Sequence, residues 1–220
     1  MFKLNPHAIK IPATKDICIQ VSAEDKVVGP IGKVEAHMRP LTLHRAFSVF
    51  LFNSKAELLL QKRSAEKVTF PSVWSNTCCS HPLYNEKELK DEKFEGIKSA
   101  ASRRMGQELG INDIPIEKFN LVGKYSYEAI MDEIWGEKEL DYSLILKNYD
   151  DLNFDKINKE EISEIKFVSK GSLDKMIKDG QAFSPWFMMF YNKGFLQKWW
   201  DDIEAKKKTT HDYGTIYKLD

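Results

Sequence analysis

The sequence predicts an α+β fold in which a mixed β-sheet is packed between helices. Strand-like and helix-like patterns follow one another without the strict strand–helix–strand alternation of a parallel α/β protein. The chain has 220 residues, which fits one large domain with extensions at both ends. Its 42% hydrophobic and 30% charged residues are typical of a soluble globular protein with a substantial core. We therefore expect residues 1–220 to form a single domain.

The N-terminal part is predicted to consist of strands. Ile17–Val21 is expected to be a short strand, and the glycines and proline within residues 29–32 indicate a turn after it. His44–Phe52 and Glu57–Gln61 are rich in residues that favour strands. The polar residues 53–56 between these two runs predict a hairpin.

The most regular helical pattern is predicted over Glu86–Leu109. Residues 67–82 before it are irregular, because prolines interrupt them. Within the helix, apolar residues recur at a spacing of three to five, and Gly110 follows as a C-terminal cap. The apolar stripe consists of Leu89, Phe94, Ile97, Ala101, Met105 and Leu109.

After this helix the pattern returns to strands. Tyr125–Ile130 and Glu137–Leu146 are predicted strands, and in the second one carboxylates and apolar residues alternate between the two faces. Glu161–Val168 is a further strand candidate, and Leu173–Lys178 a short helix. A last helix is predicted from Ser184 through Trp199 or beyond, because a serine cap followed by proline favours a helix start.

Charge and cysteine content exclude several classes of protein. Thirty-three basic residues balance thirty-three acidic ones, which argues against a nucleic-acid partner and against binding to an anionic membrane. The longest apolar runs, such as Ala46–Phe52, are too short to cross a bilayer. Residues 1–14 resemble neither a signal peptide nor a transit peptide. Three cysteines, two of them adjacent, indicate a reducing compartment. We expect a cytoplasmic protein; a peroxisomal location stays open, although the C-terminus carries no peroxisomal tripeptide.

The segment Ser75–Pro82 places a thiol two residues from an imidazole. If this segment is extended, Cys79 and His81 face the same space, whereas Cys78 points to the other side and serves packing. The arrangement is consistent with a metal site, with a nucleophile and its base, or with a chance neighbourhood. A cysteine-protease site is disfavoured, because its histidine lies far from the cysteine in sequence.

Five side chains have the chemistry of ligands for a divalent cation. The two carboxylates among them stand at i and i+2 of one predicted strand and so share a face. A solvated edge strand explains that pair equally well, and two of the histidines, taken alone, are more often ordinary surface or core residues. The five side chains are those of His37, His44, His81, Glu137 and Glu139.

Arg104 and Glu108 lie one turn apart on the same face of the long predicted helix. The pair is either a plain helical salt bridge or a phosphate-binding arginine beside a carboxylate for a Mg²⁺ on that phosphate. Lys33, Arg63 and Lys67 are further candidates for contact with an anion.

Three tryptophans lie at the two ends of the predicted last helix. The ring of Trp186 belongs either to the core or to a site, where its face would stabilise a cation on a substrate. Trp199 and Trp200 are expected in the core.

Five segments carry most of these residues and follow one another in a specific order: Leu43–Phe52, Leu58–Ser64, Asn76–Pro82, Trp135–Tyr142 and Ser184–Phe187. Together they resemble type I isopentenyl-diphosphate isomerases, and the double cysteine resembles the eukaryotic branch. The resemblance runs from about Gly32 to Trp200. It implies a Nudix-like α+β fold with a catalytic core over residues 32–200 and the Nudix-like helix over residues 86–110.

The resemblance implies isomerisation of isopentenyl diphosphate to dimethylallyl diphosphate, which feeds isoprenoid biosynthesis. An acid adds a proton to the terminal alkene carbon, a tertiary carbocation forms, and a base on the opposite face removes a proton from C2. Glu139, assisted by Tyr127, is implied to deliver the first proton. Cys79 is implied to exchange the C2 proton, and Trp186 to face the carbocation.

The resemblance also implies divalent cations and a small-molecule partner. The three histidines and two glutamates named above would hold one metal ion, with Mg²⁺ expected and Mn²⁺ or Zn²⁺ as alternatives. Glu108 would meet a Mg²⁺ carried by the diphosphate of the substrate. A monomer is expected, with no nucleic acid and no membrane. The residues implied around the diphosphate are Lys33, Arg63, Lys67 and Arg104.

The chain departs from Nudix hydrolases in one informative way. Those enzymes carry Arg-Glu-x-x-Glu-Glu-x-Gly, whereas residues 103–110 here read Arg-Arg-Met-Gly-Gln-Glu-Leu-Gly and keep only the last carboxylate. We therefore predict that the protein binds a diphosphate without cleaving it. The first alternative is a diverged Nudix-type diphosphate hydrolase. The second is a non-enzymatic binding module in which the metal ligands serve folding.

Overall fold

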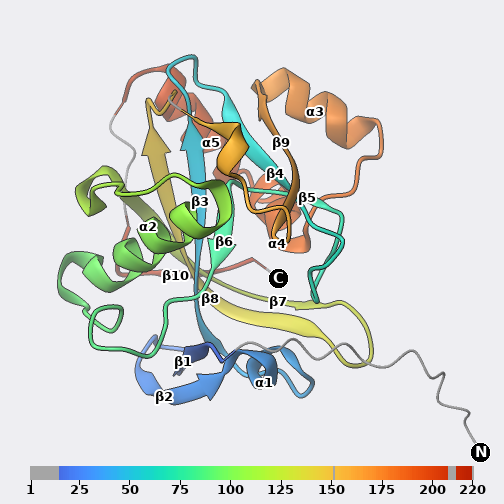
Figure 1. Cartoon of the computed structure of the whole chain (residues 1–220). Helices are drawn as coiled ribbons and strands as arrows, with labels where there is room; N and C mark the ends of the chain where they lie inside the picture. Colours follow the sequence, from blue (N-terminus) through green and yellow to red (C-terminus); the bar gives the residue numbers. More distant parts are fainter. Residues whose placement is uncertain (1–14, 151, 208–211, 220) are drawn as a thin grey trace, which may run out of the picture.

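In the computed structural model, which describes residues 15–150, 152–207 and 212–219, ten strands form one mixed sheet (Figure 1). The expectation for residues 1–14 lies outside the described residues. The strands are β1 (Ile17–Val21), β2 (Val27–Gly32), β3 (His44–Phe52), β4 (Leu58–Arg63), β5 (Trp74–Ser75), β6 (Cys78–Ser80), β7 (Asn120–Ile130), β8 (Gly136–Lys147), β9 (Ile162–Val168) and β10 (Ile216–Lys218). The helices are α1 (Lys33–His37), α2 (Glu95–Leu109), α3 (Lys170–Lys178), α4 (Pro185–Asn192) and α5 (Phe195–Glu204), with 3₁₀ turns η1 (Glu92–Phe94), η2 (Ile116–Lys118) and η3 (Phe154–Lys156).

Strand β3 forms the centre of the sheet, and all nine of its residues are buried. It runs parallel to β8, in a register that places His44 beside Glu139 and Phe52 beside Lys147. β8 pairs antiparallel with β7, and β10 runs parallel to β7. β1, β4 and β6 all pair antiparallel with β3. This mixture of parallel and antiparallel pairs confirms the predicted α+β class.

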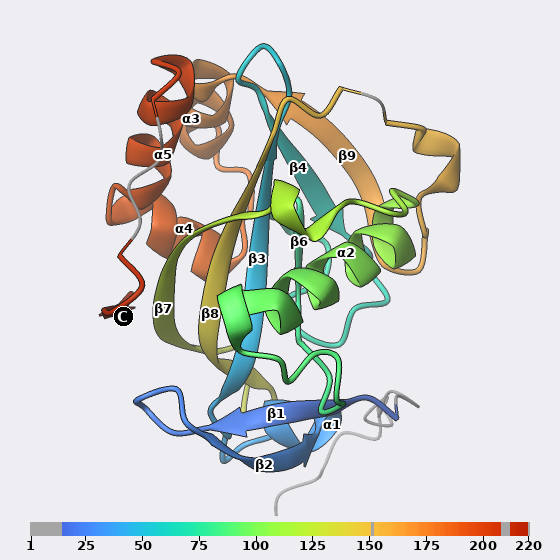
Figure 2. The same ribbon diagram turned by 90° about the vertical axis from the view of Figure 1, so that its left-hand side faces the viewer.

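Helices cover both faces of the sheet (Figures 1 and 2). On one face Ala101 and Met105 of α2 belong to a buried cluster with Leu144 of β8. On the other face Phe190 of α4 and Trp199 of α5 pack with aromatic residues of β3 and β7. The two cores use opposite faces of the same strands, because successive side chains of a strand alternate. None of the helices in the described ranges combines the length and apolar character needed to span a bilayer.

Trp200 joins α5 to the β3–β4 hairpin. Its indole N–H donates to the carbonyl of Ala56 at 2.8 Å, and its ring meets that of Phe52 edge-on with centroids 5.3 Å apart. We expect Trp200→Ala to lower the free energy of unfolding by about 3–5 kcal/mol, because a large buried ring is replaced by a cavity. Denaturant unfolding measures this change. Trp200→Phe keeps most of the ring contact and should cost clearly less; equal costs for the two variants would contradict the packing role.

The predicted helix over Glu86–Leu109 is wrong at its start, since α2 begins at Glu95. A tight turn precedes α2, and Phe94 within it has a φ of 61°, a left-handed conformation that interrupts a helix. The buried carboxylate of Glu88 holds this turn through hydrogen bonds to the preceding main chain and to an arginine of α2. Leu89 and Phe94 pack against the core from the turn, so apolar spacing alone does not distinguish it from a helix.

Three further predictions are wrong in detail. The strand predicted over Tyr125–Ile130 begins five residues earlier, since β7 starts at Asn120. The expected turn over residues 29–32 lies within β2, and the chain turns instead over residues 22–26. Pro30 is tolerated in β2 because an outer strand needs no N–H on its free side. The helix predicted over Ser184–Trp199 is divided into α4 and α5 at Gly194, whose φ of 79° favours glycine.

Four short elements have no counterpart among the predictions: α1, β5, β6 and β10. Each has five residues or fewer, too few for a period to show in the sequence. Two of them matter for the site, because α1 carries His37 and β6 carries Cys79. By contrast, β1, β3, β8 and β9 match the predicted strands to within one residue at each end.

Candidate active site

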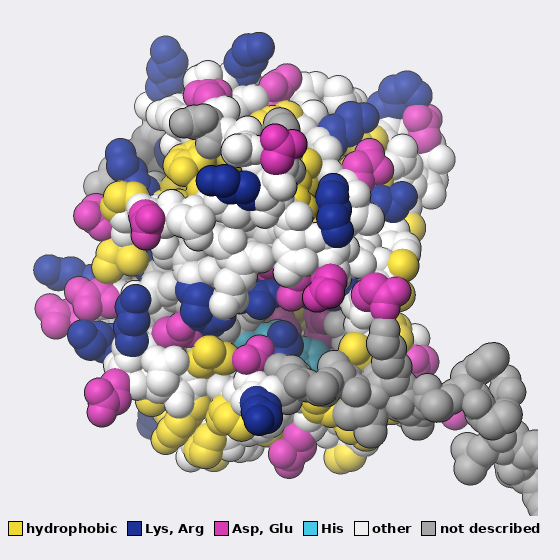
Figure 3. All heavy atoms as spheres, viewed as in Figure 1, with side chains coloured by type: hydrophobic (Ala, Val, Ile, Leu, Met, Phe, Trp, Pro, Cys, Tyr) yellow, Lys and Arg dark blue, Asp and Glu magenta, His cyan; other side chains and the backbone are white. Residues whose placement is uncertain are grey.

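A cleft of about 630 Å³ opens against one face of the central strands. Its walls come from α1, the β4–β5 loop, β6, Arg104 of α2, the β7–β8 hairpin, the turn before β9 and the start of α4. Figure 3 shows histidine side chains within a hollow on this face, with basic and acidic side chains around it. The cleft is lined by all but two of the site residues that the sequence indicates; His44 and Glu108 lie behind its surface.

Three histidines converge on one carboxylate inside the cleft. The Nε2 atoms of His81, His44 and His37 lie 2.8, 3.7 and 3.8 Å from Oε1 of Glu139. The three rings have centroids 4.7 to 4.9 Å apart. All four side chains are buried, and their candidate ligand atoms lie within 4.8 Å of one another. Such a group offers four ligand atoms to a single metal ion.

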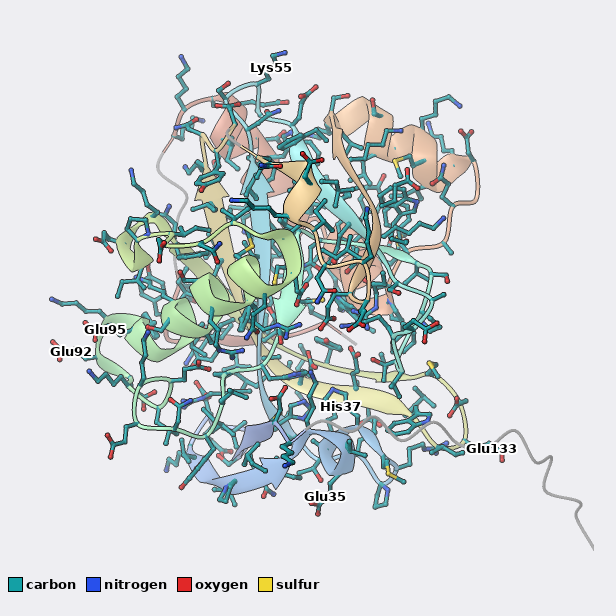
Figure 4. All side chains as sticks on the ribbon, viewed as in Figure 1. Glu35, His37, Lys55, Glu92, Glu95 and Glu133 are labelled. Atoms are coloured by element: carbon teal, nitrogen blue, oxygen red, sulfur yellow. The ribbon has the colours of Figure 1, made fainter. Side chains whose placement is uncertain are left out.

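The register of the sheet explains this convergence. Glu139 on β8 and His44 on β3 are direct neighbours across parallel strands, so their side chains share a face. His81 follows β6, which pairs with β3, and His37 ends α1. Figure 4 shows His37 between α1 and β8, whereas Glu35 of the same helix points away from them.

His37 and His44 have the tautomer expected of metal ligands. Nδ1 of His37 donates to the carbonyl of Lys33 at 2.7 Å, and Nδ1 of His44 donates to that of Thr42 at 2.8 Å. Each hydrogen bond leaves the lone pair on Nε2. Burial lowers the pKa of His44 to about 4 and that of His81 well below its usual range, so both rings are neutral at neutral pH. The buried Nε2 of His44 has no hydrogen-bond partner among the described residues, which fits a divalent cation.

Tyr127 faces the same carboxylate from β7. Its hydroxyl donates to Oε2 of Glu139 at 2.5 Å and lies 3.4 Å from Oε2 of Glu137. Burial raises the pKa of Tyr127 well above its usual range, so the phenol remains a donor. Burial also raises the pKa of Glu139, but the neighbouring His81 and its hydrogen bond outweigh it and bring that pKa well below the usual range. Glu139 is therefore ionised in this environment.

Glu137 lies beside the four-donor group rather than within it. Its Oε1 accepts a hydrogen bond from the hydroxyl of Thr69 at 2.7 Å. Burial and the neighbouring Glu139 raise its pKa. The two glutamates share a face of β8, as the spacing predicts. A role for Glu137 as a fifth ligand stays a prediction; its Oε1 accepts from Thr69, which leaves Oε2 as the candidate ligand atom.

Cys79 faces the cleft from β6. The register of β6 on β3 pairs it with Ser48 and turns Cys78 into the opposite core. The Cys79 thiol lies 3.9 Å from Nη1 of Arg63. Burial raises the pKa of the thiol to about 12, against the lowering effect of Arg63, so Cys79 carries its proton at neutral pH.

Trp186 forms an apolar wall of the cleft. Its ring lies 6.2 Å from that of Tyr127 between centroids, with the planes 25° apart. The guanidinium of Arg63 lies 5.3 Å from the centre of the indole. The indole N–H donates to Oδ1 of Asn76 at 3.1 Å, which fixes the orientation of the ring. Trp186 is thus both a core residue and a wall of the cleft.

Two of the predicted anion-binding residues share a protein carboxylate. Nζ of Lys67 lies 2.5 Å from Oε2 of Glu161, and Nη2 of Arg104 lies 3.1 Å from Oε1 of the same residue. Arg104 also forms the predicted helical pair with Glu108, at 2.5 Å. Lys33 lines the cleft on the side of α1.

Arg63 is held differently from these cations. Its Nε donates to the carbonyl of Phe70 at 2.9 Å, and its Nη2 donates to that of Thr69 at 2.7 Å. The guanidinium therefore fixes the β4–β5 loop while it contacts Cys79 and Trp186. Contact of Arg63 with a diphosphate stays a prediction.

Glu161 is the most informative cleft residue that the sequence does not indicate. It lies 94 residues from Lys67 and 57 residues from Arg104 along the chain. The pairing of β9 with β4 brings Ile162 beside Arg63 and so carries Glu161 to the cleft. In the sequence, Glu161 merely starts a predicted strand. Only knowledge of the strand order would have revealed its position.

Comparison with known proteins agrees with this geometry. The NUDIX domain family matches residues 42–187. Isopentenyl-diphosphate Delta-isomerase I of Clarkia breweri is 46% identical over 219 residues, which cover 93% of this chain and 75% of that protein. Isopentenyl-diphosphate Delta-isomerase I, chloroplastic, of Arabidopsis thaliana is also 46% identical, over 93% of this chain and 74% of that protein.

Solved structures support the same fold. The crystal structure of a protein from Deinococcus radiodurans matches with a TM-score of 0.53, over 77% of this chain and 93% of that chain. At 18% sequence identity, the similarity concerns the fold alone.

The names of the relatives correct one expectation. Sequence composition favoured a cytoplasmic location, but isomerases of Cannabis sativa and Arabidopsis thaliana are named chloroplastic. The cytoplasmic prediction is therefore wrong. The three cysteines, two of them adjacent, indicate a reducing environment, and such an environment is not confined to the cytoplasm.

Proposed function

Since this chain belongs to the isopentenyl-diphosphate Delta-isomerases of the NUDIX family, we propose that its cleft moves two protons to convert isopentenyl diphosphate to dimethylallyl diphosphate. One observation carries the proposed chemistry. Two groups reach one cleft from separate strands on the same face of the sheet: the carboxylate of Glu139 with its partner Tyr127, and the thiol of Cys79. A double-bond shift needs such a pair, because one proton is added at one carbon and another is removed two carbons away.

The proposed acid is Glu139. An unactivated alkene is a very weak base, so its protonation needs a positioned acid in a site that excludes water. The buried hydrogen bond from Tyr127 holds the carboxyl group in place. Protonation of the terminal carbon C4 gives a tertiary carbocation at C3. Cys79 then removes a proton from C2, and the new double bond joins C2 and C3.

The protonation states of Cys79 and Glu139 determine whether the site is ready for the forward or for the reverse reaction. Burial keeps the proton on Cys79, while the histidine neighbours keep Glu139 ionised. These states match the reverse reaction, in which the thiol protonates C2 of dimethylallyl diphosphate and the carboxylate takes a proton from a methyl group. The forward reaction starts once one proton has moved from the thiol to the carboxylate. Each forward turnover then restores the favoured states.

The carbocation is proposed to face Trp186. An indole face attracts a cation, and the ring is fixed by Asn76. The ring also keeps water from an intermediate that water would trap. Its stacking toward Tyr127 places this aromatic surface beside the acid.

The diphosphate is proposed to bind the basic side chains of the cleft. Lys33, Arg63, Lys67 and Arg104 all line it. Glu108 lies behind Arg104, which covers its Oε1. For Glu108 to meet a Mg²⁺ carried by the diphosphate, Arg104 must turn from it toward the phosphate oxygens. Binding of this remote group positions the alkene between the acid and the base.

The His/Glu group is proposed to hold a divalent metal ion. The donors that fit it are His37, His44, His81 and Glu139, with Glu137 as a further candidate. Mg²⁺ is the expected ion, with Mn²⁺ or Zn²⁺ as alternatives; the imidazole donors suit Zn²⁺, and the carboxylate suits Mg²⁺ and Mn²⁺. When bound, such an ion supplies positive charge that orients Glu139 and tunes its acidity.

The proposed function is tested by following isopentenyl diphosphate with the purified protein and Mg²⁺ by NMR. The expected product is dimethylallyl diphosphate, without free phosphate or pyrophosphate. Release of pyrophosphate or phosphate without isomerisation would indicate a diphosphate hydrolase instead. A binding module that only uses metal for folding would give none of these products.

Metal binding gives a prediction that does not depend on activity. We expect His44→Gln to lower the bound divalent metal from about one ion per chain to a small fraction, because loss of one donor costs 10- to 100-fold or more in affinity. Elemental analysis and titration of metal-free protein measure this. His44→Gln preserves much of the volume of a buried side chain, and thermal unfolding checks that the variant is folded. Unchanged metal content would contradict the proposed site.

The proposed acid, base and metal ligands meet in one cleft within a single fold. We therefore propose that the enzyme acts as a monomer and that residues 1–220 form the expected single domain. Sedimentation of the active protein tests the first point, because activity confined to a dimeric fraction would contradict it.

A further inference from the structure

Glu161 binds the cations at which the diphosphate is proposed to bind. Its two carboxylate oxygens contact different partners, Oε2 with Nζ of Lys67 at 2.5 Å and Oε1 with Nη2 of Arg104 at 3.1 Å. All three residues line the cleft. Two adjacent oxygens that bridge an ammonium and a guanidinium reproduce the contacts of a phosphate group.

Protein carboxylates already neutralise these cations. Arg104 is shared between Glu161 and Glu108, so two positive groups face two negative ones. Burial raises the pKa of Glu161, but Lys67 and Arg104 outweigh it and bring that pKa to about 2. Glu161 is therefore fully ionised at neutral pH. An incoming anion meets cations that already have partners.

The side chain of Glu161 is able to leave while its main chain stays in place. Its carbonyl accepts a hydrogen bond from the amide of Ser64 at 2.9 Å, and its amide donates to the carbonyl of Asn158 at 3.1 Å. The side chain is 25% exposed, so rotation about its own bonds brings the carboxylate into water. The movement therefore needs no rearrangement of β9.

We propose that Glu161 is a built-in competitor of the diphosphate for Lys67 and Arg104. This inference rests on the proposed function and extends it to anion selection. The diphosphate takes over both cations, and the Glu161 side chain turns to solvent. An anion that engages only one of the cations does not replace both ion pairs. Glu161 thus lowers the affinity of the cleft for anions, and an anion binds well only when it engages both cations.

Inorganic pyrophosphate is the probe, titrated calorimetrically into the full chain with Mg²⁺ and, separately, with EDTA. Glu161→Gln keeps the size of the side chain and removes its charge. We expect pyrophosphate to bind Glu161→Gln about three- to tenfold more tightly than the unchanged protein, since one partly exposed carboxylate no longer competes. Glu160→Gln is the matched control, because Glu160 also lines the cleft but forms no ion pair among the described residues. Its affinity should stay within about twofold of the unchanged protein.

Other outcomes overturn the inference. Equal or weaker binding by Glu161→Gln would show that Glu161 supports the site. Weaker binding only with Mg²⁺ would show that Glu161 holds the metal of the diphosphate. Glu161→Ala repeats the test with a second side chain, and thermal unfolding confirms that each variant is folded.

Isomerisation is measured on the same unchanged protein. An affinity gain without isomerisation contradicts only the proposed function, whereas isomerisation without the gain contradicts only the role of Glu161.

Discussion

Replacing Glu139 with glutamine is expected to lower kcat by about 10²- to 10⁴-fold, the range that a positioned general acid contributes. Glutamine has nearly the same shape but carries no transferable carboxyl proton. The hydrogen bond from Tyr127 to the side-chain oxygen can persist, so the loss reports chemistry rather than a collapsed site. Steady-state kinetics with isopentenyl diphosphate measure the effect. KM should change much less than kcat, because the diphosphate contacts lie elsewhere in the cleft.

Two measurements separate the acid role of Glu139 from its other contacts. Glu128→Gln makes the same substitution on the neighbouring strand β7, where Glu128 pairs with Lys138 at the surface and its side chain is 41% exposed. This control should keep kcat within about twofold, since exposed pairs contribute little. Metal content is determined for both variants. A Glu139→Gln variant that retains the metal and more than about a tenth of kcat would contradict an acid role, given the usual size of this contribution.

Replacing Cys79 with alanine is expected to lower kcat by about 10³-fold or more, because no other described group of the cleft is proposed to take the C2 proton. Cys79→Ser should recover little of the loss. A serine hydroxyl is far less acidic than a thiol, so it supplies a proton acceptor even more rarely. Single-turnover measurements under saturating substrate report the chemical step directly.

Cys78 provides the matched control on the same strand. Its side chain is fully buried in the opposite core, packed with the apolar face of α2. Cys78→Ala should keep kcat while it lowers the free energy of unfolding by about 1–2 kcal/mol, since it removes a small buried group. A large loss of kcat in Cys78→Ala, with normal turnover in Cys79→Ala, would contradict the assignment of the two thiols.

The strands with a clear pattern were predictable from sequence alone. β3 is a nine-residue run of mostly β-forming residues, and its position at the centre of the sheet buries every one of them. β8 alternates carboxylates with apolar residues, which is visible in sequence and places Glu137 and Glu139 on one face. The start of α2 was not predictable, because Phe94 keeps a helical spacing while its backbone adopts a left-handed turn.

The site was predictable where its residues are close in sequence. The i, i+2 relation of Cys79 and His81 places both on the cleft, as an extended segment requires. The approach of His44 to Glu139 depends instead on the parallel pairing of β3 with β8, which local patterns do not contain. Glu161 reaches the cleft through the pairing of β9 with β4. Contacts made by strand order are therefore the part that the sequence alone could not supply.

The central claim is that two protein groups exchange protons with the substrate at two different carbons, and isotope labelling tests it most directly. Isopentenyl diphosphate is incubated with the protein and Mg²⁺ in D₂O, and the product is followed by NMR. The proposed mechanism predicts dimethylallyl diphosphate with deuterium in a methyl group from the first turnovers. After prolonged incubation it also predicts deuterium at C2 of the isopentenyl diphosphate that the reverse reaction regenerates. Both labels should be lost together with turnover in Cys79→Ala and in Glu139→Gln. Unlabelled dimethylallyl diphosphate, or free pyrophosphate in its place, would contradict the mechanism.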